Sequence, residues 1–272
     1  MSIRDGTHPG IVASWASGYA LAVLIGIDHL VIAVPDPDAA AADLAAALGL
    51  TPGGGGRHDR LGTYNRLLWL GDTYLELIGV FDAGLAGESW VGQPTLTVLA
   101  SAAGTGLATW AIATDDLEAD LDRLRTTGSD LGPARVGERR RPDDQVVTWR
   151  LAASPTLEPD GPPFLIEHDR TSAEWTVEDR AARALAPARL TAIEISVTDV
   201  AATTFRFLKT VGLRFRPSLQ GGGARDADIG RQIVRIMPRR PDPVPPTAIR
   251  LTIPGRPPVR TDLLGCRWVI GS

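Results

Sequence analysis

Three ionisable side chains stand inside apolar segments that are typical of buried β-strands. His29 lies near the start of 27–34, Glu76 in the middle of 73–80 and Glu167 near the end of 164–168. A carboxylate inside a buried strand must be hydrogen-bonded, paired with a cation or bound to a metal. A histidine can donate or accept a proton near neutral pH. These residues are therefore the first candidates for acid–base or metal chemistry, provided that their side chains face a cavity.

Each of the three also has a structural alternative. His29 is then a core histidine hydrogen-bonded to a backbone carbonyl group, and Glu76 is the partner of one of the many arginines. Glu167 is followed directly by His168 and is then a surface carboxylate at a strand end. The sequence leaves both sets of interpretations open.

Five further residues are candidates for lining such a cavity. His58 follows a run of four glycines and is either an acid–base group or a solvated loop residue. Asn65 either lines the cavity or makes turn hydrogen bonds. Trp110 and Trp149 either wall an apolar pocket or pack in the core. Arg141 ends a charged Glu-Arg-Arg-Arg segment that is usually a solvated loop, but over the cavity it would hold a carboxylate or phosphate group by a bidentate pair.

The elements that position these residues begin with a strand, a helix and further strands. An alanine-rich helix is predicted over 37–48, after the strand 27–34, and Gly49 suits its C-cap. Strands are predicted over 65–70 and 73–80. The glycine-rich segment 51–56 is predicted to be irregular.

This order of elements then recurs twice along the chain. The second pass comprises a strand over 106–114, a helix over 117–127 and strands over 146–151 and 164–168. The third comprises a strand over 190–197, a helix over 201–210 and strands over 231–237, 248–253 and 265–270. Repetition of one unit predicts an architecture built from equivalent modules.

Composition and charge narrow the class of protein. The 272 residues are 44% hydrophobic and 22% charged, as in ordinary soluble globular proteins. The net charge of −4 gives no argument for nucleic acid or an anionic membrane as a partner. Cys266 is the single cysteine, so an intramolecular disulfide is impossible. This leaves the compartment unconstrained and is compatible with the cytoplasmic location that we expect. The glycine runs do not match a nucleotide-binding fingerprint, and there is no Gly-x-Ser-x-Gly nucleophile motif.

The segment 10–27 carries no formal charge, which raises the question of a signal peptide or membrane helix. It is interrupted by Ser14, Ser17 and Gly18, and it runs directly into the first strand without a spacer for cleavage. We expect residues 1–24 to form an N-terminal extension that packs on the domain.

Several short motifs, in this order and at this spacing, resemble the vicinal oxygen chelate superfamily, and within it the glyoxalase-like subgroup. They are Asp28-His29-Leu30-Val31, Gly56-Arg57-His58, Gly62-Thr63-Tyr64-Asn65, Tyr74-Leu75-Glu76-Leu77-Ile78, Arg141-Pro142-Asp143 followed by Trp149, and Phe164-Leu165-Ile166-Glu167. The resemblance implies an α+β fold of repeated βαβββ modules that form a curved, cup-shaped mixed sheet, as in bleomycin resistance-like proteins. It covers about residues 25–170.

The resemblance also implies a site. Metal ligands in the superfamily lie on the first and last strands of each module, which correspond here to His29, Glu76 and Glu167. The fourth position falls at Thr109, which is not a suitable ligand. One histidine and two carboxylates suit Mn, Fe(II), Zn, Ni or Mg, and without the fourth ligand the site binds metal weakly or not at all.

The implied function is isomerase or lyase chemistry on a small carbonyl compound. A metal would stabilise an enolate or oxyanion while Glu76, Glu167 or His58 moves a proton; Asn65, Trp110, Arg141 and Trp149 would bind the substrate. The alternative is a metal-independent protein that sequesters an antibiotic-type small molecule between tryptophans. A third reading, cofactor-free catalysis by His58 or Glu76 in the same cup, is not distinguished by the sequence.

The expected domain organisation follows from the repeats. Residues 25–170 form two paired modules, 171–187 a helical connector, and 188–272 a third, partial module. A module without a partner in the chain predicts either pairing across a homodimer or a cap over the cup.

Overall fold

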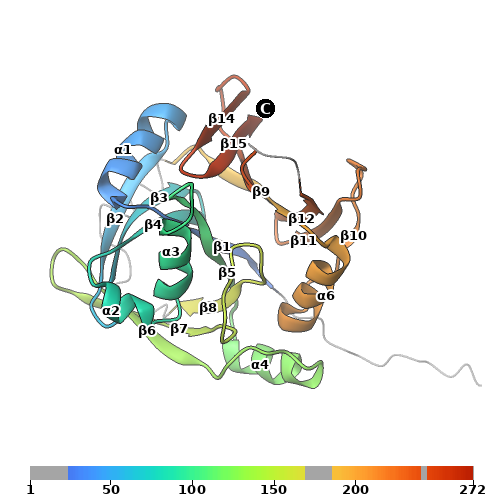
Figure 1. Cartoon of the computed structure of the whole chain (residues 1–272), viewed down its shortest axis with the longest axis horizontal. Coiled ribbons are helices and arrows are strands. Elements are labelled where there is room, and N and C mark those ends of the chain that lie inside the picture. Colours follow the sequence, from blue (N-terminus) through green and yellow to red (C-terminus); the bar gives the residue numbers. More distant parts are fainter. Residues whose placement is uncertain (1–23, 169–185, 240–243, 272) are drawn as a thin grey trace, which may run out of the picture.

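The computed structural model describes residues 24–168, 186–239 and 244–271. Two curved sheets lie next to each other, a closed barrel in the first part of the chain and a seven-stranded open sheet in the last part (Figure 1). The predicted connector lies almost entirely outside the described residues, as does nearly all of the N-terminal extension.

The first module positions most of the residues that the sequence singled out. Its elements are β1 (Gly26–Ala33), α1 (Pro37–Leu48), β2 (Thr51–His58), β3 (Thr63–Leu70) and β4 (Thr73–Val80). The α1 helix begins where the Asp36 side chain accepts hydrogen bonds from two backbone amides, and it ends at Gly49 in the left-handed conformation, as predicted. The β1 strand pairs with β4 in parallel, which gives the strand order β1-β4-β3-β2.

The second module repeats this arrangement and closes the barrel. Two short helices, α2 (Ala83–Gly87) and α3 (Gly92–Leu99), lead to β5 (Gly106–Ala113), α4 (Leu117–Thr126), β6 (Arg135–Arg140), β7 (Val146–Ala152) and β8 (Phe164–His168). The β5 strand pairs with β1, and β6 meets β2, so that the order β1-β4-β3-β2-β6-β7-β8-β5 returns to its start. The predicted cup-shaped α+β fold is confirmed.

The prediction for the glycine-rich segment is wrong, because 51–58 forms strand β2. The reason is close approach of the neighbouring strands. A Cβ atom added at Gly55 would lie 2.2 Å from the carbonyl oxygen of Asn65, and one at Gly56 would lie 2.2 Å from that of Arg140. Only glycine fits at such contacts, so the glycines allow β3 and β6 to pack on either side of β2. The interpretation of Glu138 to Arg141 as a loop is wrong for the same part of the barrel, since most of it belongs to β6.

The last part of the chain contains more than the one partial module that was predicted. Its elements are β9 (Arg189–Val197), α6 (Val200–Val211), β10 (Arg216–Pro217), β11 (Arg225–Ile229), β12 (Gln232–Pro238), β13 (Thr247–Thr252), β14 (Val259–Leu263) and β15 (Cys266–Gly271). The sheet order is β10-β11-β12-β9-β13-β15-β14. It matches the barrel order β2-β3-β4-β1-β5-β8-β7 strand for strand, and among the described residues it lacks only a strand equivalent to β6. The segment therefore comprises a third complete module and part of a fourth.

A shared apolar core joins the barrel to the second sheet. It contains side chains from the outer faces of β1 and β5, from α1, α4 and α6, and from one face of the second sheet, among them Leu30, Trp110, Leu44, Leu121, Phe207 and Trp268. A separate apolar cluster lies inside the barrel and includes Val31, Ile78, Ala111, Phe164 and Ile166. Successive residues of these strands thus point alternately into the barrel and into the core that the barrel shares with the second sheet.

The second sheet contains a buried ionic network at its centre, where the barrel has its cavity. Arg235 on β12 donates hydrogen bonds to Glu194 Oε1 at 2.7 Å and to both carboxylate oxygens of Asp226, at 2.7 and 2.9 Å. Arg250 Nε lies 2.6 Å from Glu194 Oε1. The two arginines hold the pKa of Glu194 below its usual range, although its burial acts in the opposite direction.

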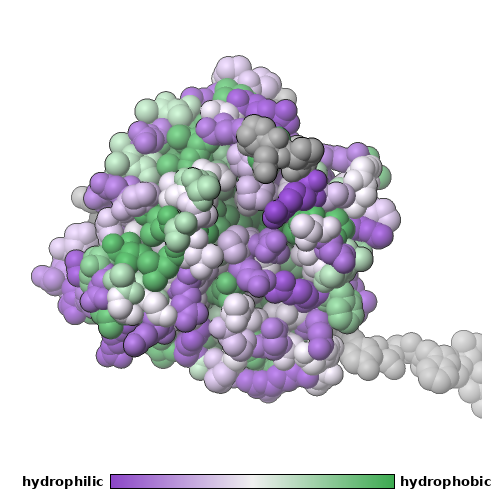
Figure 2. Space-filling view, in the orientation of Figure 1, coloured by the Kyte–Doolittle hydropathy of each residue, from purple (hydrophilic) through white to green (hydrophobic). Residues whose placement is uncertain are grey.

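Both polar and apolar side chains are exposed at the surface. In the view of Figure 2, polar and charged side chains cover much of the face, and apolar groups gather on the left, over the part of the barrel that carries α2 and α3. Phe81 and Leu85, near and within α2, are among the exposed apolar side chains. In the described part of the chain, no helix combines the length and apolar character needed to span a membrane.

Candidate functional site

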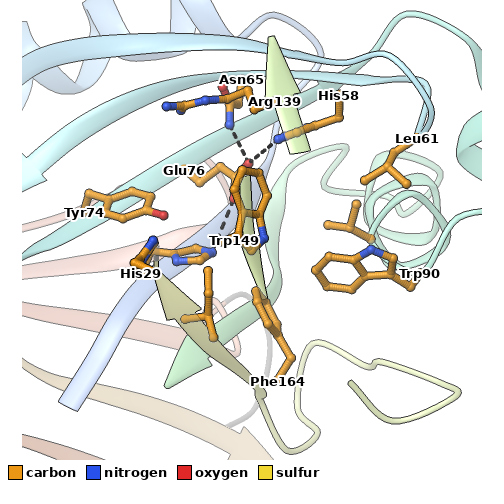
Figure 3. A pocket seen from close by; sticks show the side chains of 13 residues that line it. His29, His58, Leu61, Asn65, Tyr74, Glu76, Trp90, Arg139, Trp149 and Phe164 are labelled. Carbon is orange, nitrogen blue, oxygen red and sulfur yellow. Dashed lines mark hydrogen bonds and ion pairs between the residues drawn. The ribbon is translucent and has the colours of Figure 1, made fainter. Parts of the chain in front are cut away.

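A small polar cavity lies inside the barrel (Figure 3). Its water-accessible volume of about 40 Å³ holds a few water molecules. Three histidines, one carboxylate, one amide, one guanidinium and several aromatic rings surround it: His29, His58, His168, Glu76, Asn65, Arg139, Tyr74, Trp90, Trp149 and Phe164, together with Leu61, Val91 and Ile166.

Glu76 is at the centre of this group. Its Oε1 atom accepts a hydrogen bond of 2.6 Å from Asn65 Nδ2 and lies 3.8 Å from His58 Nε2, and its Oε2 atom lies 3.4 Å from His29 Nε2. Dashed lines in Figure 3 connect Glu76 to these three side chains. The carboxylate is therefore buried, fixed in position and directed into the cavity, and the structural alternative of an arginine salt bridge does not apply within the described residues.

His29 is oriented by its sequence neighbour. The pairing of β1 with β5 has a register shift between Ile27 and His29, and such a bulge re-aims side chains. The Asp28 and His29 side chains consequently meet, with Asp28 Oδ1 2.6 Å from His29 Nδ1. Since Nδ1 faces a carboxylate, Nε2 is the ring atom that faces Glu76.

Asp28 also contacts a second histidine. His168 Nε2 lies 2.8 Å from Asp28 Oδ2. Burial opposes ionisation of Asp28, but the charges and hydrogen bonds of His168 and His29 outweigh it and hold its pKa well below the usual range. Asp28 is thus an ionised carboxylate that holds one histidine at each of its two oxygens.

His58 is a neutral imidazole at neutral pH. Burial lowers its pKa to about 4, and the positive charge of Arg139 contributes, while Glu76 acts in the opposite direction. His58 Nδ1 is hydrogen-bonded with the Thr63 hydroxyl at 3.0 Å, so Nε2 is left facing Glu76 and the cavity. A neutral imidazole in this position can donate a hydrogen bond to an oxygen atom of a bound molecule.

The lowered pKa of His58 predicts a loss of stability in acid. In the unfolded chain the imidazole takes up a proton near pH 6.5, but in the folded protein only near pH 4. The free energy of unfolding should therefore fall as the pH decreases from 6.5 to 4, by about 3 kcal/mol from this group. Urea unfolding between pH 7.5 and 4 measures the slope. His58→Gln should flatten it by nearly one proton, and an unchanged slope in this variant would contradict the assignment.

Glu167 does not reach the cavity, so this part of the sequence prediction is corrected. Its Oε2 atom accepts a hydrogen bond from the backbone amide of Leu117, at the start of α4, and lies 3.5 Å from an Arg150 nitrogen. Side chains alternate along a strand. Phe164, Ile166 and His168 face the cavity, and Glu167 therefore faces the other side of β8.

Trp110 and Arg141 also lie elsewhere than the substrate-binding prediction placed them. Trp110 packs in the core outside the barrel, with its ring centroid 6.1 Å from that of Phe207 on α6. Arg141 is buried just beyond β6 and forms an ion pair with Asp143. Trp149 and Asn65 do line the cavity.

Sequence reasoning missed several residues that line the cavity, among them Arg139, Trp90 and His168, and it missed Asp28, which contacts His29. Arg139 and Trp90 lie at the cavity, where the sequence prediction had placed Arg141 and Trp110. Asp28 and His168 were missed because the sequence analysis predicted neither the bulge in β1 nor which side chains of β8 point into the barrel. The alternation of Phe164, Ile166 and His168 was a signal that could have identified His168.

The second module lacks metal ligands at the positions that correspond to His29 and Glu76. Alignment of the helix caps Asp36 and Asp116 places Thr109 opposite His29. Val31 pairs with Glu76 across β1 and β4, and the equivalent pair across β5 and β8 is Ala111 with Phe164. The counterpart of Glu76 is therefore Phe164, an apolar ring.

The donor set does not fit the metal centre that is common in this superfamily. Of the three predicted ligands, His29 and Glu76 converge and Glu167 does not. Within the described ranges, no group of three His, Cys, Asp or Glu side chains is arranged to hold a metal ion. A Zn, Fe or Mn site needs at least three such protein ligands.

A closed barrel of paired βαβββ modules with a polar cavity inside defines the glyoxalase class of fold. A model of the glyoxalase-like domain matches residues 27–211, more than half of the chain. The chain belongs to this family, and with it to the vicinal oxygen chelate superfamily. The resemblance seen in the sequence is thus confirmed.

Solved structures extend the comparison. A hypothetical protein from Staphylococcus aureus has 15% sequence identity and a TM-score of 0.70, and the match covers 90% of this chain and 98% of that chain. It shows that another protein shares the whole fold. Methylmalonyl-CoA epimerases from Mycobacterium tuberculosis and Streptomyces coelicolor match at 23% and 24% identity with TM-scores of 0.38 and 0.39, over 55% and 53% of this chain and 92% and 98% of theirs. No curated protein matches the sequence.

Proposed function

We propose that this chain is an isomerase that moves a proton at a carbon atom next to a carbonyl group of a small organic substrate. The observation that carries the proposal is the buried Glu76 carboxylate at the wall of the cavity, hydrogen-bonded to Asn65 and flanked by His29 and His58. A fixed carboxylate in a site with little water is suited to act as a general base.

In the proposed reaction, Glu76 removes the proton from the carbon next to the carbonyl group. The C–H electron pair becomes the carbon–carbon double bond of an enolate, and the carbonyl oxygen takes the negative charge. His58, neutral and anchored by Thr63, donates a hydrogen bond from Nε2 to this oxygen. In a substrate with a hydroxyl group on the deprotonated carbon, the hydroxyl proton then moves to the former carbonyl oxygen and Glu76 returns its proton to the former carbonyl carbon. This restores the carboxylate and completes the isomerisation.

His29 and Asp28 support this cycle from behind the base. The proton that Glu76 gains can be shared with His29 Nε2, 3.4 Å away, and Asp28 stabilises the resulting positive charge on the imidazole ring. Trp149 and Trp90 form part of the cavity wall and limit the entry of water.

Proton exchange with solvent tests the proposal. Small ketones, hydroxyketones and 2-oxocarboxylates are incubated with the protein in D2O, and the loss of α-proton signals is followed by NMR. At least one compound should exchange faster than without protein. Because the donor set does not fit a metal, the rate should survive treatment with a chelator. Failure of every compound would contradict the enzyme, and loss of the rate with a chelator would contradict the metal-independent mechanism.

A binding protein of the same fold is the second candidate. The aromatic wall formed by Trp90, Trp149, Phe164 and Tyr74 favours it. Saturable binding of compounds that never exchange their α-protons would support this function over the isomerase.

A further inference from the structure

Arg139 is a buried cation that faces the cavity and has no counter-ion among the residues that the structure describes. Only 5% of its surface is exposed, and its Nε atom is buried and donates no hydrogen bond within the described residues. No carboxylate in the described part of the chain forms an ion pair with it, and most other arginines that point inward, such as Arg235, have one. A buried charge without a partner is costly, because it has lost its water shell and gained no counter-ion.

The position of Arg139 follows from the closure of the barrel. It lies on β6, and its side chain passes the backbone of Gly56 on β2, where an added Cβ atom would lie 2.9 Å from Arg139 Cγ. Arg140, the next residue, points to the opposite face and pairs with Asp59 at the surface. The glycine of β2 thus makes room for a guanidinium to enter the cavity, close enough to His58 to lower its pKa.

We infer that Arg139 binds the carboxylate group of the substrate, and that the substrates are short 2-oxocarboxylates. This inference rests on the proposed function and names its substrate class. A guanidinium group accepts a planar carboxylate by two parallel hydrogen bonds. The cavity has room for only a few water molecules, which suits a short chain and not a large anion. A 2-oxocarboxylate held in this way presents its carbonyl oxygen to His58 and its C3 protons to Glu76.

The aromatic rings of the cavity allow binding to be measured apart from catalysis. Trp149 and Trp90 line the cavity, so occupancy should change their fluorescence. The probes are pyruvate and 2-oxobutyrate, with pyruvamide as an uncharged molecule of the same shape. The two carboxylates should give a saturable change and raise the melting temperature, and pyruvamide should bind at least about tenfold more weakly.

Arg139→Met should weaken binding of the carboxylates by about 10- to 100-fold and leave pyruvamide unaffected. Without ligand, this variant should melt at or above the temperature of the natural protein, because it removes an unpaired buried charge. Arg139→Lys keeps the charge without the planar fork and should bind with intermediate strength. Arg140→Met, on the other face of the same strand, is the matched control and should bind as the natural protein does.

The outcomes separate this inference from the proposed function. Equal binding of pyruvate and pyruvamide by the natural protein, no binding of either, or undiminished binding of pyruvate by Arg139→Met would overturn the role of Arg139, even if neutral ketones exchange their protons. If Arg139→Met does not fold, the comparison of pyruvate with pyruvamide still decides. Arg139-dependent binding without proton exchange would support the carboxylate site and contradict the isomerase.

Discussion

Replacement of Glu76 by Gln is expected to lower the rate of α-proton exchange by about 10²- to 10⁴-fold, the usual contribution of a general base. The amide cannot accept a proton from carbon. It can, however, keep the surrounding contacts, because its oxygen still accepts from Asn65 and its NH2 group can donate to His29 Nε2. The variant should therefore fold normally and still bind ligand. The NMR exchange assay in D2O measures the effect.

Glu167→Gln provides the matched control for this experiment. Glu167 is also a carboxylate near the end of a strand, but it contacts the start of α4 and not the cavity. Its replacement should leave the exchange rate unchanged and cost at most about 1 kcal/mol of stability through the weaker helix contact. If the two variants lose the same activity, or if Glu76→Gln retains most of it, Glu76 is not the base.

The largest loss of stability is expected from Arg235→Met in the second sheet. Arg235 neutralises both Glu194 and Asp226, and all three side chains are buried. Removal of one partner leaves uncompensated charge in the interior, which typically costs about 3–5 kcal/mol. The free energy of unfolding, measured by urea titration at pH 7.5, reports this loss.

An exposed ion pair in the same sheet gives the comparison. Arg216 pairs with Asp228 at the surface, where both side chains are more than half exposed. Arg216→Met should change the free energy of unfolding by about 1 kcal/mol or less. Equal effects of the two substitutions would mean that the buried network adds nothing beyond an ordinary surface pair.

The elements with clear periodicity were predictable from the sequence. The helix over 37–48 and the strands over 73–80 and 164–168 have the predicted bounds, because helix caps and apolar runs are local signals. Strand β2 was not predictable, since its glycines are required by backbone contacts with two other strands, at Asn65 on β3 and at Arg140 on β6. The short strands β10, β11 and β14 have only weak strand patterns in their sequences, and they form because they pair with neighbouring strands of the sheet.

Most site residues of the first module were predictable from the sequence, and most of those of the second module were not. His29 and Glu76 stand out as polar residues in apolar strands, and the structure brings them together. The prediction of Glu167 followed residue type, although the strand alternation favoured His168. Arg139 could not be distinguished from Arg141 because the facing of β6 depends on the closure of the barrel.

The barrel and the second sheet share one strand order, so that equivalent positions can be compared between them. Mutations at such positions are expected to have different consequences in the two sheets. The residue of the second sheet that corresponds to Glu76 is Arg235, since Glu194 pairs with Arg235 as Val31 pairs with Glu76. The barrel has an open cavity at this place, and the second sheet fills the same place with mutually neutralising charges. A substitution at this place in the barrel would then change which molecules bind. A substitution at the same place in the second sheet would change the amount of folded protein.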